Sequence, residues 1–131
     1  MAKIPLPPYR GGLPDLKMEA KTADYQVTKE DSGTIFHTTG ATAAVNFTLP
    51  PITDGPFYFS FVNGADQNLT VTAKAADTAV TYNDLTADSV AFSTSSEKIG
   101  GSVDVFCDGT TLFVLPRFAG GRYQSATIAT A

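Results

Sequence analysis

Apolar and polar residues alternate with a period of two along much of the chain from about residue 21 onward. The clearest case is Val45-Asn46-Phe47-Thr48-Leu49, where every second side chain is apolar. This spacing puts the apolar side chains on one face and is typical of a half-buried β-strand. No segment shows the longer period of an amphipathic helix. Similar patterns predict strands near 25–28, 35–38, 57–61, 69–72, 79–82, 90–92, 103–107 and 112–115.

Residues that favour turns separate these predicted strands. Asn63-Gly64 and Asp108-Gly109 have the composition of tight hairpin turns, and we expect a hairpin at each. About eight short strands with turns at roughly ten-residue intervals predict an all-β fold, as an antiparallel β-sandwich or a jelly-roll-like barrel. Pro116 is expected to end this domain, which therefore covers residues 21–116.

Residues 1–20 have a different composition, with four of the chain's eight prolines between Ile4 and Pro14. Proline removes an amide donor and favours extended backbone, so we expect an extended arm close to polyproline II. Its regularly placed apolar side chains suit docking in a groove of a partner protein, and a disordered terminal tail is the alternative. The predicted arm contacts are Ile4, Leu6, Pro7, Pro8, Tyr9, Arg10 and Leu13.

The stretch after the last predicted strand, residues 117–131, has two interpretations. Its threonines and Tyr123 suit a strand added to its own sheet or to a neighbour's, and otherwise it forms a second arm. Arg117, Arg122 and Tyr123 are its candidate partner contacts.

Charge is distributed unevenly between the body and the two ends of the chain. Residues 22–116 carry three lysines against eleven acidic residues, a net charge of −8, whereas residues 1–21 and 117–131 each carry +2. Basic ends could reach onto acidic surfaces, including the body of another copy, unless the asymmetry is chance scatter. The acidic body, with its phenylalanines assigned to the core, argues against nucleic acid as a partner.

Few residues of the chain suit catalysis or metal binding. His37 is the only histidine and Cys107 the only cysteine, and Cys107 falls on the apolar face of its strand, where a core role is expected rather than a Cys–His nucleophile. The four ligands of a zinc site are lacking, and the acidic residues do not have the spacing of a calcium loop. Glycine-rich phosphate loops and known catalytic motifs are absent from the sequence. We therefore expect no enzymatic activity, no metal and no cofactor.

The sequence also indicates the cellular compartment in which the protein is made. A single cysteine cannot form an intrachain disulfide, and the N-terminus lacks the apolar run of a signal peptide. Membrane spans need about 20 consecutive apolar residues, and none of the stretches approaches that length. We expect synthesis in a reducing cytoplasm and no membrane association.

Three stretches resemble a β-module found in virion proteins of tailed bacteriophages. Together they span most of residues 21–116. The module occurs in capsid decoration (cement) proteins and in tail or fibre proteins. The stretches are Asp24-Tyr25-x-Val27-Thr28-x-x-Asp31-Ser32-Gly33-x-x-Phe36, Gly40-Ala41 through Val45-Asn46-Phe47-Thr48-Leu49-Pro50, and Val105-Phe106-Cys107-Asp108-Gly109-Thr110-x-x-Phe113-Val114.

A short chain with two arms is most similar to the decoration proteins, which clamp neighbouring capsid subunits and often form trimers. The resemblance implies a structural virion protein on the outer capsid surface, made in the host bacterial cytoplasm. The implied partners are the major capsid protein and other copies of the chain, as a trimer or a dimer. The resemblance identifies no catalytic residue.

A second interpretation is a carbohydrate-binding module, either associated with a phage tail or fibre or displayed on the surface. Exposed aromatic rings would form its binding face, and interface or core-edge positions are the other roles open to them. A hydrolase that uses His37 ranks third. The candidate rings are Tyr9, Tyr58, Tyr82 and Tyr123.

Overall fold

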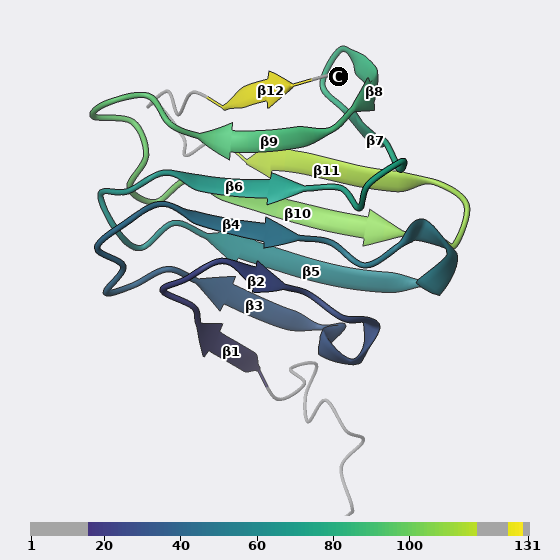
Figure 1. Cartoon of the computed structure of the whole chain (residues 1–131), viewed down its shortest axis with the longest axis horizontal. Helices are drawn as coiled ribbons and strands as arrows, with labels where there is room; N and C mark the ends of the chain where they lie inside the picture. Colours follow the sequence, from purple (N-terminus) through teal and green to yellow (C-terminus); the bar gives the residue numbers. More distant parts are fainter. Residues whose placement is uncertain (1–15, 118–125, 130–131) are drawn as a thin grey trace, which may run out of the picture.

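The computed structural model of the chain describes residues 16–117 and 126–129. These residues form two β-sheets that lie face to face, and the five-stranded sheet is in front of the seven-stranded one in Figure 1. Buried apolar side chains from both sheets make one shared core. The all-β prediction is confirmed, and the arrangement is sandwich-like. The jelly-roll form of the prediction is not confirmed.

The strands are numbered in chain order, and their order within each sheet is different. The seven-stranded sheet consists of β1 (Lys17–Ala20), β3 (Thr34–His37), β5 (Phe57–Val62), β10 (Ser102–Cys107), β11 (Leu112–Arg117), β7 (Ala79–Thr81) and β8 (Asp84–Ala87). The five-stranded sheet consists of β12 (Thr127–Ala129), β9 (Ser89–Phe92), β6 (Leu69–Thr72), β4 (Val45–Thr48) and β2 (Tyr25–Gln26). The described residues also include two short 3-10 turns, η2 (Lys29–Asp31) and η3 (Ile52–Asp54). In the described ranges, no helix is long and apolar enough to cross a membrane.

The first six strands alternate between the two sheets. As a result β1, β3 and β5 are parallel neighbours in one sheet, and β2, β4 and β6 are parallel neighbours in the other. Parallel strands need a crossover connection, and here each crossover is a strand of the opposite sheet rather than a helix. The sheets are therefore mixed, whereas the sequence pattern predicted antiparallel pairing throughout. Alternating apolar and polar side chains indicate that one face of a strand is buried. The same alternation occurs in parallel and in antiparallel strands, so it does not predict the pairing direction.

The later strands pair mainly in the antiparallel sense. β10 lies between β5 and β11 and is antiparallel to both. The predicted hairpin at Asp108-Gly109 is confirmed, because it connects β10 directly to β11. Oδ1 of Asp108 accepts the backbone N–H groups of Thr110 and Thr111 at 2.8 and 2.7 Å, which satisfies two donors in the turn.

The hairpin predicted at Asn63-Gly64 is wrong. This dipeptide connects β5 of one sheet to β6 of the other, so the chain crosses the sandwich instead of reversing within a sheet. The Asn63 side chain is buried, and its Nδ2 donates to the carbonyl of Gln67 at 2.8 Å. The hydrogen bonds of the Asn63 side chain stabilise the crossing. Without knowledge of these partners, an Asn-Gly pair at a crossing cannot be distinguished from one in a hairpin turn.

Four phenylalanines form the centre of the core. Phe36 of β3, Phe47 of β4, and Phe59 and Phe61 of β5 are all fully buried. The rings of Phe47 and Phe61 come from opposite sheets, and their centroids are 4.8 Å apart. Burial of each such side chain contributes about 1.5–3 kcal/mol, so this cluster is a main reason why the two sheets stay together.

The predicted domain boundaries differ from the observed strands at both ends. Lys17–Ala20, within the predicted arm of residues 1–20, forms the edge strand β1 beside β3. β11 continues through Pro116 to Arg117, and on its β7 side only Phe113 has a partner in register, so the missing N–H of Pro116 breaks no hydrogen bond there. Thr127–Ala129 adds to the chain's own five-stranded sheet beside β9, as one of the two interpretations predicted.

Candidate functional site

Three aromatic side chains lie in one line across the outer face of the seven-stranded sheet. Phe106 of β10 lies directly opposite Tyr58 of β5 on one side and Phe113 of β11 on the other. Their exposed fractions are 38% for Tyr58, 44% for Phe106 and 37% for Phe113. The ring centroids of Tyr58 and Phe106 are 5.2 Å apart with an interplanar angle of 34°. We call Tyr58, Phe106 and Phe113 the aromatic row.

The alternation of each strand explains why these rings point outward. On β5, Phe57, Phe59 and Phe61 point into the core, and Tyr58 between them faces the other way. On β10, Val105 is buried and its neighbour Phe106 is exposed. Full burial of a large apolar side chain contributes about 1.5–3 kcal/mol, and these partly exposed rings forgo part of it. Contiguous exposed rings are typical of interaction surfaces.

A set of polar side chains lies beside the aromatic row on the same face. Asp104 is opposite Ser60 and accepts a hydrogen bond from its hydroxyl at 3.1 Å. Nε of Arg117 is 3.0 Å from Oδ2 of Asp104, and its Nη2 donates to Oγ of Ser60 at 3.0 Å. These contacts hold the guanidinium of Arg117 against the sheet, although its side chain is 54% exposed. The outer face thus has an apolar line next to a fixed polar cluster.

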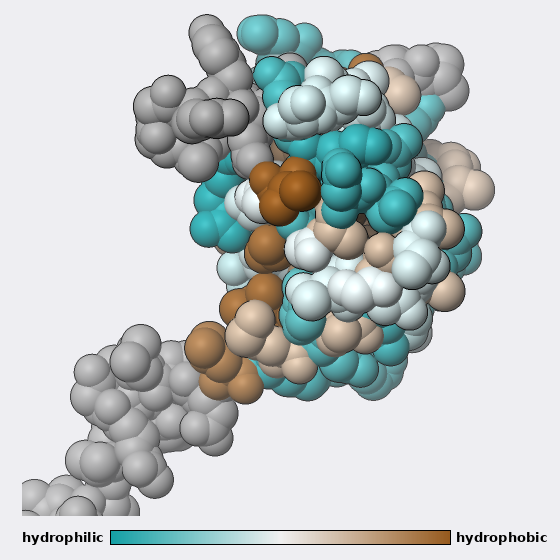
Figure 2. Space-filling model, turned by 90° about the vertical axis from the view of Figure 1, so that its left-hand side faces the viewer, coloured by the Kyte–Doolittle hydropathy of each residue, from teal (hydrophilic) through white to brown (hydrophobic). Residues whose placement is uncertain are grey.

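The apolar surface continues towards the edge of the sheet at β1. Met18 lies opposite Ile35 of β3, so both side chains are on the outer face, and Met18 is 57% exposed. Leu16, just before β1, is also exposed. Figure 2 views the molecule from one end and shows hydrophobic side chains gathered along one margin of the described body. The β1 edge of the seven-stranded sheet is therefore partly apolar.

The structure separates the two residues considered for nucleophilic chemistry. His37 lies opposite Val62 and Cys107 lies opposite Phe57, five positions away on the same strand β5. Five strand residues span about 17 Å, so the side chains cannot form a Cys–His pair. Cys107 is buried, its Sγ is 3.6 Å from the carbonyl oxygen of Ile52, and burial raises the pKa of its thiol. Its burial and its raised pKa both indicate that Cys107 packs in the core and is not a nucleophile.

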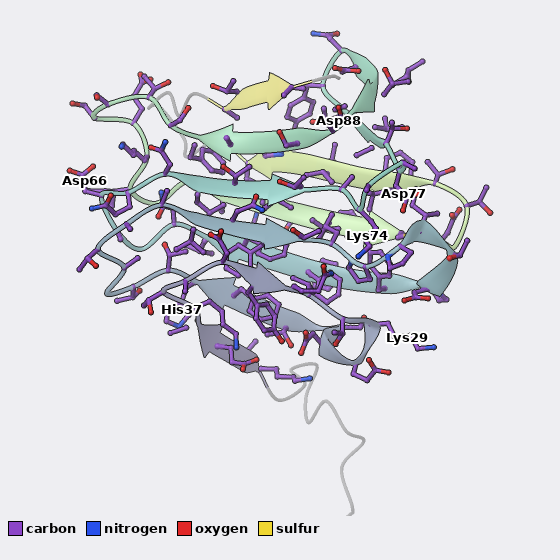
Figure 3. The ribbon with its side chains drawn as sticks, in the orientation of Figure 1. Lys29, His37, Asp66, Lys74, Asp77 and Asp88 are labelled. Atoms are coloured by element: carbon purple, nitrogen blue, oxygen red, sulfur yellow. The ribbon has the colours of Figure 1, made fainter. Side chains whose placement is uncertain are left out.

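A shallow hollow of about 340 Å³ lies elsewhere on the described body, and residues 72–78 with Asp88 line it. Figure 3 shows Lys74 and Asp77 at the end of the sandwich opposite His37. The carboxylate of Asp77 accepts the backbone N–H of Ile52 at 3.0 Å, so its position is explained by the start of η3. Within residues 16–117 and 126–129, no group of three His, Cys, Asp or Glu side chains is placed to hold a metal ion.

The candidate contacts predicted from the sequence fall mostly outside the described residues. This applies to Ile4, Leu6, Pro7, Pro8, Tyr9, Arg10 and Leu13 of the arm and to Arg122 and Tyr123, and these contacts stay predictions. Arg117 is described and binds Asp104 and Ser60 of its own chain.

Two residues of the aromatic row were not predicted from the sequence. The phenylalanines were all assigned to the core, and this is wrong for Phe106 and Phe113, which are exposed. The signal was present in the alternation, because Phe106 falls on the same face as Asp104. Alignment with Tyr58 could not be foreseen, because it depends on the register of β5 with β10.

Comparison with known proteins adds no family. No protein-family model, curated protein or solved structure matches the chain.

Proposed function

We propose that this chain is a structural protein of a tailed-phage virion that decorates the capsid and stabilises it by joining neighbouring subunits. The observation that carries the proposal is the aromatic row on a rigid sheet face, since exposed contiguous rings are a feature of protein–protein interfaces. The resemblance of the body to phage β-modules supports the same assignment.

The proposed action is mechanical. Residues 1–15 precede a strand at the edge of the seven-stranded sheet, and fully extended they would span up to about 50 Å. That length exceeds the width of the seven-stranded sheet, about 29 Å, so the arm could reach beyond the surface that the body itself covers. A body contact combined with an arm contact binds by avidity, because the second contact forms at a high effective concentration. Many such weak links around the shell resist expansion of the capsid from within.

The test is reconstitution on undecorated capsids of the phage that encodes the chain. A variant that lacks residues 1–15 is compared with the full chain, and the deletion stops there because β1 begins at Lys17. The matched control carries residues 4–14 in scrambled order, which preserves length, composition and charge. We expect occupancy, measured by cryo-EM, to fall at least tenfold for both variants at subsaturating concentration.

Two outcomes would contradict the proposal in different ways. Equal occupancy of the deletion variant would show that the arm is not a capsid contact. Failure of the full chain to bind any capsid would remove the decoration role itself. Circular dichroism of each variant checks that the sandwich is intact.

A carbohydrate-binding module is the second candidate, and the adjacent, exposed Tyr58 and Phe106 rings favour it because sugars bind to exposed aromatic faces. Glycan-array binding that is lost on Tyr58→Ser and retained on Tyr82→Ser would support it. Tyr82 is a suitable control, because it is exposed but lies outside the aromatic row, with its hydroxyl bonded to the carbonyl of Pro116.

A further inference from the structure

The proline-rich segment, residues 4–14, contains a regular spacing of prolines with a following arginine. Pro5 and Pro8 are three residues apart, and Arg10 follows two residues later. In polyproline II, three residues make one turn with a rise of about 3.1 Å each. Pro5 and Pro8 would therefore lie on the same side of the segment, about 9.3 Å apart. Segments of this kind bind to surfaces lined with aromatic rings, where little chain entropy is lost.

The aromatic row has a matching repeat. Neighbouring strands are about 4.8 Å apart, so the distance from Tyr58 across Phe106 to Phe113 is about 9.6 Å. The spacing of the two prolines and the spacing of the outer two rings agree to within about 0.3 Å. A polyproline II segment lying across the strands would place one proline beside Tyr58 and the other beside Phe113.

Charge around the row also suits this segment. Phe106 is flanked along β10 by Asp104, whose carboxylate pairs with Arg117, and just past the strand end by Asp108, two residues away on either side. The Asp108 carboxylate is exposed, and hydrogen bonds from the backbone N–H groups of Thr111 and Thr110 lower its pKa, which keeps it anionic. Arg10 is the cation of the segment, and residues 22–116 as a whole carry −8 against +2 for residues 1–21.

We propose that the aromatic row binds the proline-rich segment, residues 4–14, of a second copy of this chain. The segment is attached at β1, the edge of the sheet, from which about 50 Å of extended chain exceeds the width of seven strands, about 29 Å. Each copy has one segment and one row, so the contact is head-to-tail, and we expect it to close into a ring of a few copies rather than to extend as an open filament. This contact is an alternative to the proposed capsid contact of the same segment, because one segment cannot occupy both at once. It needs no capsid and goes beyond the proposed function.

The test uses the full chain in solution and two variants with complementary defects. Pro5→Ser/Pro8→Ser alters only the segment, and Phe106→Thr/Phe113→Thr alters only the row with a residue that suits strands. Sedimentation velocity over a range of concentrations measures association. We expect the wild-type chain to form a closed oligomer, and each variant to raise the dissociation constant at least tenfold.

Mixing the two variants is the decisive measurement. The row variant has an intact segment and the segment variant has an intact row, so the mixture should form one-to-one pairs that cannot grow further. Ile99→Thr is the control, because Ile99 is exposed and lies outside the row, and it should associate as the wild type does.

Three results would overturn the proposal. Association of the segment variant at wild-type strength would mean that two rows meet face to face. A wild-type chain that stays monomeric at all concentrations would mean that the row does not bind a second copy. The row would then bind the segment of its own chain or another ligand such as a glycan. An equimolar mixture without pairs would exclude the head-to-tail contact.

A second measurement covers a failure of the row variant to fold. A synthetic peptide of residues 1–15 is added to the wild-type chain, and we expect it to dissociate the oligomer, whereas the same peptide with Pro5→Ser and Pro8→Ser should be at least tenfold weaker. Equal potency of the two peptides would contradict the proposal. Because no capsid is present, a negative result here leaves the capsid occupancy test unaffected.

Discussion

The hydroxyl of Thr38 donates a 2.7 Å hydrogen bond to Oδ1 of Asn63, and both side chains are almost completely buried. Thr38 follows β3 and Asn63 follows β5, so the bond joins the two points where the chain leaves the seven-stranded sheet to cross the sandwich. The same Thr38 oxygen accepts the backbone N–H of Gly64 at 3.0 Å. One buried network therefore fixes two crossings at once.

We predict that Asn63→Ala destabilises the protein by about 3 kcal/mol, because it leaves the Thr38 hydroxyl and the Gln67 carbonyl without their buried partner. Denaturant unfolding monitored by circular dichroism measures the change. The exposed Thr42→Ala should change the free energy of unfolding by less than about 0.5 kcal/mol. A loss below about 1 kcal/mol for Asn63→Ala would mean that the network is not needed for the crossings.

Gly101→Ala tests the packing at the start of β10. A Cβ atom at residue 101 would lie 2.6 Å from the ring of Phe92, which is fully buried and cannot move aside. We expect a loss of about 1–3 kcal/mol in the free energy of unfolding, as in other overpacked cores. Adding Phe92→Leu should make the effect of Gly101→Ala smaller, because the ring is gone. Equal costs of Gly101→Ala in the two backgrounds would contradict the steric explanation.

Tyr25 should make stability depend on pH in the alkaline range. Burial, and then the hydrogen bond to Asp31, raise the pKa of Tyr25 from 10.0 to about 12. The folded chain thus holds the phenolic proton more tightly than the unfolded chain does, so this contribution is complete below pH 10 and is lost as the pH rises towards 12.

Unfolding by denaturant at several pH values, with Tyr25→Phe, checks this prediction. We expect the variant to be about 1 kcal/mol less stable at pH 7 for want of the hydrogen bond to Asp31, and to lose less stability than the wild type above pH 10. The exposed Thr42→Ala, which changes no titratable group, should retain the wild-type pH dependence. Parallel pH curves for the wild type and Tyr25→Phe would show that another group is responsible.

The ion pair between Asp104 and Arg117 should contribute only weakly to the free energy of unfolding. Their ion pair has a 3.0 Å contact, but the Arg117 side chain is 54% exposed, so solvent screens much of the attraction. A double-mutant cycle with Asp104→Asn and Arg117→Met should give a coupling energy of about 0.5–1 kcal/mol, reduced by salt. Coupling that is unchanged in high salt would indicate that the hydrogen bonds through Ser60 dominate.

Local signals were sufficient for most strands and for one of the two hairpins. Val45–Thr48 and Leu69–Thr72 form where alternation predicted them, because a period of two reports burial of one face whatever the partner strand is. Asp108-Gly109 forms a hairpin because its turn is closed by bonds within the turn itself, from Thr110 and Thr111 to Oδ1 of Asp108. These features depend on residues close together in the chain.

The candidate site was only partly predictable. Alternation along β10 places Phe106 outward, and the same argument places Tyr58 outward on β5. Their meeting with Phe113 in one row depends on the registers of β10 with β5 and with β11. The register of β10 with β5 is decided by core packing between residues more than 40 positions apart, and no local pattern records it.

The sequence by itself determined that this protein is all-β, which faces of its strands are buried, and that its proline-rich start differs from its acidic body. Only the tertiary structure decided that the chain crosses the sandwich after Val62, that early strands pair in parallel, and that three rings align across one face. The physical reason is that periodicity and turn residues act over a few positions, whereas sheet partners are chosen by packing between distant segments such as those that carry Phe47 and Phe61.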